Sequence, residues 1–101
     1  MPDKYRLTRR AEADLEDIFE YTLRMWGAAQ AESYVRKILQ SFDRLASQPN
    51  MGRLREEIAP PVRLLHVERH LVIYRSIDVG IEVIAVTHDR RNWRALGLFG
   101  D

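Results

Sequence analysis

Two amphipathic helical patterns that meet at Gly27 are the feature that most limits how this chain can fold. In the first pattern, apolar residues recur at helical spacing from Ala11 and stop near Gly27, a residue type that commonly ends helices. The second pattern begins at Ala31. It ends before Pro49, because the residue before a proline resists helical geometry. The predicted core faces are Leu15, Ile18, Phe19, Thr22 and Trp26, then Ala31, Tyr34, Ile38, Phe42 and Leu45. Helices joined by so short a turn must form an antiparallel hairpin.

The remaining segments predict strands on which this hairpin packs. Residues 4–8 alternate polar and apolar side chains and lead to Thr8, a plausible helix N-cap. After an aperiodic loop, three apolar runs begin at Val62, His70 and Ile81, with turns at residues 68–69 and before Gly80. The last run is apolar on both faces, which is typical of a central strand covered on both sides. Residues 90–101 predict a short C-terminal helix or a tail.

We therefore predict an α+β fold over residues 1–101, one domain with element order β-α-α-β-β-β. An N-terminal strand and a two-helix hairpin pack on a small antiparallel sheet. The length of 101 residues suits one domain.

Composition and missing motifs narrow the function classes. The net charge of +1 comes from 16 basic and 15 acidic residues, which gives no general attraction to nucleic acid, so we expect no sequence-specific DNA binding. The chain has no cysteine, no apolar run of the ~20 residues that span a bilayer, and no apolar signal region near its start. We expect a cytoplasmic protein without membrane association. Glycine-rich phosphate loops, metal-ligand spacing and nucleophile motifs are also absent from the sequence, so we predict neither cofactor nor metal.

Arginines and one histidine near strand ends are the remaining candidates for chemistry. His88 follows the last strand and is a candidate general base for RNA cleavage, with Arg63 and Arg75 holding the phosphate. The structural alternative is that His88 ends the strand and the two arginines pair with glutamates across the sheet. The candidates for contacting a target are Arg90, Arg91, Trp93 and Arg94, although Trp93 could equally cover the core.

Apolar residues also exceed what the two core faces require. Tyr21, Leu23 and Met25 add a stripe to the first helix, and Val35 and Leu39 add to the second. A hairpin on a sheet needs broad apolar stripes, so packing alone explains part of this surplus. The functional alternative is a groove for an amphipathic partner helix.

The chain resembles the ParE toxins of the RelE/ParE superfamily, bacterial type II toxin–antitoxin proteins. The segments that carry this resemblance occur in the family's order from Tyr5 to Trp93: YRLTRRAEADLEDIFEYTLRMWG, QAESYVRKILQSFDRLASQPNMGR, REEIAPPVR, HLVIYR and GIEVIAVTHDRRNW. The resemblance implies the fold predicted above. It also implies a ParD-like antitoxin partner in a toxin–antitoxin hetero-oligomer, and DNA gyrase as the poisoned target. Tyr21, Met25, Val35 and Leu39 are then our candidates for antitoxin binding.

The resemblance to the superfamily also permits a second hypothesis, that this chain cleaves ribosome-bound mRNA as the RelE branch does. Those nucleases place basic residues and a Tyr or His where the sheet meets the C-terminus, and His88 falls at a comparable place. Residues 50–101 contain eight arginines but no lysine, and no tyrosine follows His88. The set of basic and aromatic residues that such a nuclease would use is therefore incomplete, and we favour a non-catalytic gyrase inhibitor. The alternatives are a nuclease using His88, Arg63 and Arg75, or a degenerate member that only binds antitoxin.

Overall fold

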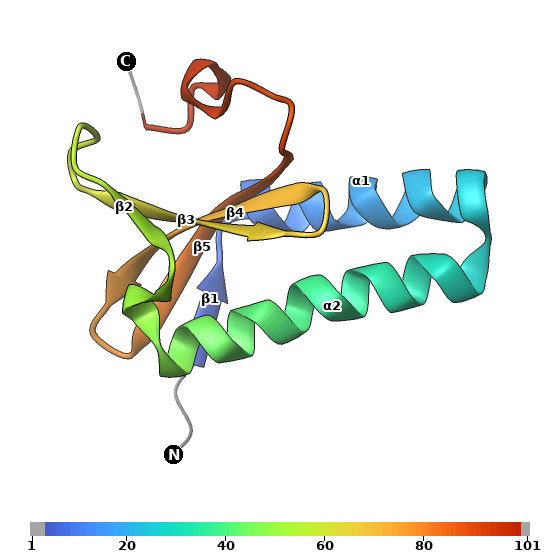
Figure 1. Ribbon diagram of the computed structural model, residues 1–101, viewed down its shortest axis with the longest axis horizontal. Helices are drawn as coiled ribbons and strands as arrows, with labels where there is room; N and C mark the ends of the chain where they lie inside the picture. Colours follow the sequence, from blue (N-terminus) through green and yellow to red (C-terminus); the bar gives the residue numbers. More distant parts are fainter. Residues whose placement is uncertain (1–3, 100–101) are drawn as a thin grey trace.

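The computed structural model describes residues 4–99. Its elements are β1 Lys4–Leu7, α1 Arg9–Trp26, α2 Ala28–Ser47, a 3-10 turn at Pro49–Met51, β2 Arg53–Arg55, β3 Val62–Val67, β4 His70–Ile77, β5 Gly80–His88 and a 3-10 turn at Trp93–Leu96 (Figure 1).

The helix hairpin is confirmed. Thr8 caps α1 by accepting the Ala11 N–H at 3.1 Å, and Gly27 separates the helices at φ +91°. The predicted C-terminal segment forms a single 3-10 turn, and residues 100–101 lie outside the described part.

The sheet has the strand order β1-β5-β4-β3-β2. Strands β2 to β5 pair antiparallel with their neighbours, as predicted for the three long runs, while β1 adds a parallel edge beside β5. The parallel pairing was not predicted, because alternation within a strand carries no information about its partner. Strand β2 falls inside the predicted loop, since three residues are too few to show a period.

Beyond the end of β1, side chains from the N-cap and first turns of α1 hydrogen-bond the backbone of β5. The Thr8 hydroxyl donates to the Ile84 carbonyl at 2.7 Å, and the Asp14 carboxylate accepts the Val86 N–H at 2.9 Å. A β-bulge in the β4–β5 pairing, at Ile73/Tyr74, changes which backbone groups of β5 face outward at this point. The helix start therefore caps the sheet edge that the four-residue β1 leaves open.

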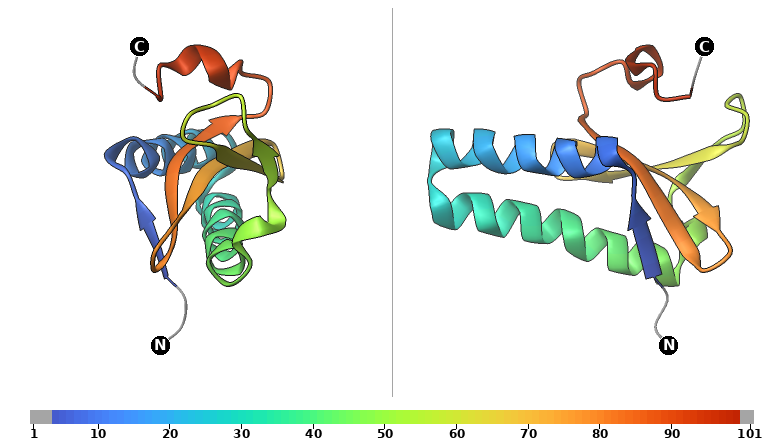
Figure 2. Two further views of the ribbon diagram at one scale, coloured as in Figure 1. Left: turned by 90° about the vertical axis from the view of Figure 1, so that its left-hand side faces the viewer. Right: turned by 180° about the vertical axis from the view of Figure 1, so that it is seen from behind.

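Both faces of the sheet are covered, but by different parts of the chain (Figure 2). The helix hairpin packs on one face around Ile38, Phe42 and Tyr74, all fully buried. The C-terminal segment covers part of the other face, where a second cluster contains Val62, Leu64, Ile73, Ala85 and Trp93. This two-sided coverage explains why β5 is apolar on both faces and confirms its interior position.

The far end of the hairpin extends beyond the turn between β3 and β4 (Figure 1). We predicted Trp26 on the core face of α1, and this assignment is wrong, because 70% of Trp26 is exposed. Helical spacing is correct there, but no sheet remains to bury the side chain. Within residues 4–99, neither helix is long and apolar enough to cross a membrane.

Candidate functional site

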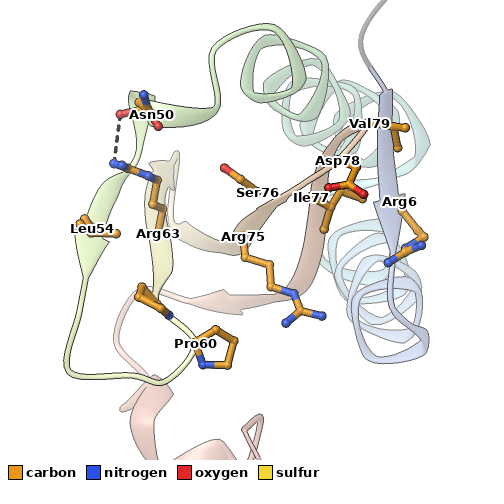
Figure 3. Close-up of a pocket in the computed structure, with 11 residues that line it drawn as sticks. Arg6, Asn50, Leu54, Pro60, Arg63, Arg75, Ser76, Ile77, Asp78 and Val79 are labelled. Carbon is orange, nitrogen blue, oxygen red and sulfur yellow. Dashed lines mark hydrogen bonds between the residues drawn. The ribbon is translucent and has the colours of Figure 1, made fainter.

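An arginine-lined notch lies at the end of the sheet where β4 turns into β5 (Figure 3). Its volume is about 780 Å³. Five parts of the chain form its walls, namely β1, the segment from the 3-10 turn into β2, the loop before β3, the start of β3, and the β4–β5 hairpin. The lining residues are Arg6, Asn50, Leu54, Pro60, Pro61, Arg63, Arg75, Ser76, Ile77, Asp78 and Val79.

The arginines of the notch have two kinds of partner. Arg75 donates from Nε to the Glu82 carboxylate at 3.0 Å, and Arg6 approaches the other oxygen of Glu82 at 3.2 Å. Arg63 instead donates to the carbonyl oxygens of Asn50 and Gly52, at 3.2 and 2.8 Å. Pairing with a glutamate across the sheet is therefore confirmed for Arg75 and wrong for Arg63. The guanidinium of Arg63 contacts neutral oxygens because the loop after α2 brings those carbonyls beside β3.

All three histidines, His66, His70 and His88, lie at the opposite end of the sheet, which we call the histidine corner. His70 lies opposite His88 in the strand register, with ring centroids 5.4 Å apart. His66 contacts Asp89 at 2.8 Å between Nε2 and Oδ2, and this hydrogen bond lowers the pKa of Asp89. Sequence spacing did not predict this cluster, which depends on the register of three strands. The two-residue turn at residues 68–69 was a usable signal, since it sets Val67 opposite His70.

Tyr34 of α2 connects the hairpin to this corner. Its oxygen lies 2.6 Å from His70 Nδ1 and accepts the Arg69 N–H at 3.1 Å. Because desolvation disfavours imidazolium, and because His88 adds further repulsion, the pKa of His70 falls to about 4. His70 is therefore neutral near pH 7, and its Nδ1 lies within hydrogen-bond distance of the Tyr34 hydroxyl. Burial in turn raises the pKa of Tyr34.

The fold separates the three residues of the nuclease alternative. Arg75 lies opposite Glu82, while His88 lies six positions further along β5, a distance of roughly 20 Å in an extended strand. Arg63 lies opposite Tyr74, next to Arg75 and away from His88. The two arginines therefore share the notch, whereas His88 belongs to the histidine corner. In the part of the chain described here, no three His, Cys, Asp or Glu side chains are arranged to hold a metal ion.

The predicted target-contacting residues divide into exposed and buried members. Arg90 and Arg91 are exposed on the turn after β5. Trp93 is only 6% exposed and packs in the second core cluster, which is the structural role that the sequence left open. Arg94 lies over the Trp93 ring at 4.6 Å from its centroid, and it pairs with Glu57 at 2.7 Å. That contact lowers the pKa of Glu57.

The residues predicted to bind antitoxin lie on the hairpin but in two environments. Tyr21 and Met25 are 55% and 56% exposed, whereas Val35 and Leu39 are half-buried against the core beneath the helices. Tyr21 also lines a cleft of about 580 Å³ between the far end of the hairpin and the β3–β4 turn. The other lining residues of this cleft are Thr22, Trp26, Gln30, Ser33, Tyr34, Lys37, Glu68, Arg69, His70 and His88. It combines exposed aromatic rings with charged groups.

Known proteins match this chain over most of its length. The family described as "ParE toxin of type II toxin-antitoxin system, parDE" matches residues 5–93. Toxin ParE1 of Caulobacter vibrioides is 40% identical over 91 residues, which cover 90% of this chain and 94% of that protein. Toxin ParE1 of Mycobacterium tuberculosis is also 40% identical, over 89% and 93% of the two chains. Toxin ParE of Escherichia coli is 39% identical, over 85% and 84%.

A solved structure shares the fold. A chain of the chromosomal ParDE toxin–antitoxin system from P. aeruginosa superimposes with a TM-score of 0.73 at 25% sequence identity, over 86% of this chain and 96% of that chain. Sequence and fold agree on the same assignment, and this chain belongs to the ParE toxin family of type II toxin–antitoxin systems.

Proposed function

We propose that this toxin inhibits growth by poisoning DNA gyrase, that it breaks no RNA itself, and that a ParD-like antitoxin neutralises it. The family assignment supports the toxin role and the existence of an antitoxin. DNA gyrase is the target that the ParE resemblance implies. We place the action in the cytoplasm, where gyrase works on DNA.

The separation of His88 from the two arginines carries the non-catalytic part of the proposal. A nuclease needs its general base within hydrogen-bond reach of the proton it removes, and its arginines on the same phosphate. In this fold roughly 20 Å of strand separates His88 from the residue that pairs with Arg75. One ribonucleotide phosphate cannot reach both places, so the three residues do not form one catalytic site.

Assays of the purified toxin without antitoxin, on gyrase and on ribosome-bound mRNA, test the target. We expect purified toxin to make gyrase accumulate cleaved DNA and to leave ribosome-bound mRNA intact. His88→Ala, at the histidine corner, should keep this activity, because His88 removes no proton in the proposed mechanism. Ribosome-dependent mRNA cleavage that is lost in His88→Ala, with gyrase unaffected, would establish the nuclease alternative. A toxin that binds antitoxin but affects neither target would be a degenerate member.

We further propose that an amphipathic helix of the antitoxin binds the exposed far end of the hairpin and enters the adjoining cleft. Tyr21, Met25 and Trp26 expose apolar surface there that the chain itself leaves uncovered. Lys37 pairs with Glu68 at 3.9 Å, so Arg69 leaves the cleft with an excess of positive charge that favours an acidic residue beside the apolar stripe of such a helix. Val35 and Leu39 contribute only the surface that core packing leaves exposed. The result is a toxin–antitoxin hetero-oligomer.

Matched substitutions on α1 test this antitoxin surface. Tyr21→Ser and Met25→Ser should each weaken antitoxin binding at least about tenfold, because both remove exposed apolar anchors. Leu23→Ser is the control, since Leu23 is also exposed but lies about 160–200° around the helix from the other two. Titration calorimetry should show a negative heat-capacity change in the wild-type complex. Equal losses in all three variants would contradict a surface on the Tyr21 side.

A further inference from the structure

The notch described above exists because β4 is longer than its neighbour β3. Pairing between β3 and β4 stops at Arg63 opposite Tyr74, whereas pairing between β4 and β5 continues to Ile77 opposite Gly80. The chain before β3 is Pro60–Pro61, and a proline has no backbone N–H to offer a strand. The edge of β4 from Arg75 to Ile77 therefore faces the notch without a pairing strand from β3 (Figure 3).

The backbone of Ser76 points into this open space. Lys4 and Thr8 donate their N–H groups to the Val79 and Val83 carbonyls of the β4–β5 hairpin, at 3.3 and 3.1 Å. Alternation along β5 places Ile81, midway between these residues, in the same orientation toward β1. Ser76 lies opposite Ile81. Its own N–H and C=O therefore point away from β5 and toward the notch, and its side chain is exposed.

Arginines flank this open backbone on both faces of the sheet. Arg63 lies on the same face as Ser76, because Arg63 is opposite Tyr74 and alternate residues of β4 share a face. Arg75, one residue before Ser76, projects from the other face. Arg63 contacts only neutral carbonyl oxygens in its two hydrogen bonds, and Arg75 shares a single carboxylate with Arg6. The notch therefore has three positive charges, from Arg6, Arg63 and Arg75. Two carboxylates, of Asp78 and Glu82, oppose them and leave an excess of positive charge.

We propose that the notch binds an extended acidic peptide segment as an additional short strand beside β4. One residue of the segment pairs through its backbone with Ser76, and two consecutive acidic side chains reach Arg63 on one face and Arg75 on the other. Consecutive acids are required because neighbouring residues in a strand point to opposite faces. Arginine forks bind carboxylates in bidentate geometry. This surface is distinct from the antitoxin cleft, and the inference holds whichever protein supplies the segment.

A peptide is favoured over a nucleic acid because the open edge offers an acceptor as well as a donor. The Ser76 carbonyl repels a phosphate oxygen but accepts the N–H of an added strand. The sugar–phosphate backbone of DNA has no hydrogen-bond donor to use that carbonyl, and in RNA the 2′-hydroxyl is the only backbone donor. The same edge therefore distinguishes the two kinds of polyanion.

The probe is the blocked peptide acetyl-Val-Glu-Glu-Val-amide, titrated into the full-length protein while backbone amide signals are followed by NMR. We expect the largest chemical-shift changes at Ser76 and Ile77. The glutamine counterpart, acetyl-Val-Gln-Gln-Val-amide, should bind at least about tenfold more weakly, because it lacks the charge-assisted bonds. Arg63→Gln and Arg75→Gln should each cause a similar loss. Arg53→Gln is the matched control, since Arg53 is exposed on β2 outside the notch lining.

Three outcomes would overturn the proposal. One is equal binding of the acidic and glutamine peptides. Another is a shift pattern that avoids Ser76 and Ile77 or persists in both notch variants. The third is stronger binding of a short oligothymidylate at the same amides, which would make the notch a nucleic-acid groove. Melting curves of each variant show whether it is folded, and none of these results depends on gyrase or on antitoxin binding at the cleft.

Discussion

Tyr34 ties the helix hairpin to the histidine corner. Its hydroxyl shares a hydrogen bond with His70 Nδ1 and accepts the Arg69 N–H, so one side chain of α2 holds both the β3–β4 turn and the first residue of β4. Glu68 in that turn has φ +55°, a strained value for a residue with a side chain. The turn contains no glycine to adopt this positive φ, and the hydrogen bonds of Tyr34 stabilise it.

His70 should make the stability of the protein depend on pH. Its pKa in the folded state is about 4, below the ordinary value of 6.5, so the unfolded chain binds the proton more readily. The contribution of neutral His70 is complete above pH 6.5 and is lost as the pH falls from 6.5 to about 4. The drop in pKa from 6.5 to about 4 corresponds to roughly 3 kcal/mol, and solvent screening of this partly exposed residue reduces the expected loss to the order of 2 kcal/mol.

Urea unfolding of the wild type and His70→Gln at several pH values between 4 and 7.5 measures this contribution. Glutamine keeps an acceptor for the Tyr34 hydroxyl but has no charge to gain. We expect a flatter stability profile below pH 6.5 in His70→Gln. Parallel profiles for the two proteins would mean that groups other than His70 cause the pH dependence.

Sequence reasoning found the residues of the sites better than it found their grouping. The exposed stripe on α1 and the arginines of the sheet were identified from residue type and spacing. The histidine corner was missed, since His66, His70 and His88 meet only through the register of three strands. Trp93 was ambiguous for a related reason. A tryptophan after a strand serves equally well in a core or an interface, and only the path of the C-terminal segment decides.

At the scale of elements, the contact between β1 and the β4–β5 hairpin depends on Gly80. A Cβ atom at Gly80 would lie 1.8 Å from the Lys4 carbonyl oxygen, and the residue has φ +144°. Gly80→Ala should therefore separate β1 from β5 and destabilise the protein by about 2–4 kcal/mol. Gly27→Ala is the matched control, because Gly27 also has positive φ but a Cβ there meets no atom within 4 Å. Its expected cost is that of the backbone strain alone, roughly 1–3 kcal/mol, and smaller than the cost at Gly80.

Chemical denaturation of both glycine variants gives the two values. Hydrogen exchange of the amides that β1 and β5 share would locate the damage in Gly80→Ala. Equal destabilisation of the two variants would show that backbone strain, and not the close approach of β1, sets the cost.

The helices were predictable because their apolar spacing, cap and terminating residues all lie within the segments themselves. Thr8, Gly27 and Pro49 mark the ends of α1 and α2 in the sequence and in the structure. Exposure along α1 was not predictable to the same degree. Helical spacing assigns Ile18 and Trp26 to the same face, yet Ile18 is buried and Trp26 lies beyond the sheet. The length of the sheet under a helix is a tertiary property that the period of the helix does not contain.

For the whole molecule, we propose that the C-terminal edge contacts the target, and this role can be tested separately from stability. Arg90 and Arg91 are exposed, so replacing both with alanine should reduce toxicity and gyrase-mediated DNA cleavage while the melting temperature changes little. Trp93→Ala should instead cost about 3–5 kcal/mol, because the side chain fills the second core cluster. Growth assays, gyrase cleavage assays and thermal melts on both variants make the comparison. Full toxicity in the double arginine variant would remove these residues from the target surface.

The pairing of β1 with β5 also has a consequence for synthesis on the ribosome. Residues 4–7 find their partners at residues 80–83, which are separated by 76 positions of sequence. At translation rates of 5–20 residues per second, the partner strand follows roughly 4–15 s after β1. The helix hairpin can form during that interval, but the sheet beneath it cannot be completed. A chain that ends before residue 80 therefore lacks the strand that joins its first residues to the rest of the fold, and we expect such fragments to be harmless and rapidly degraded.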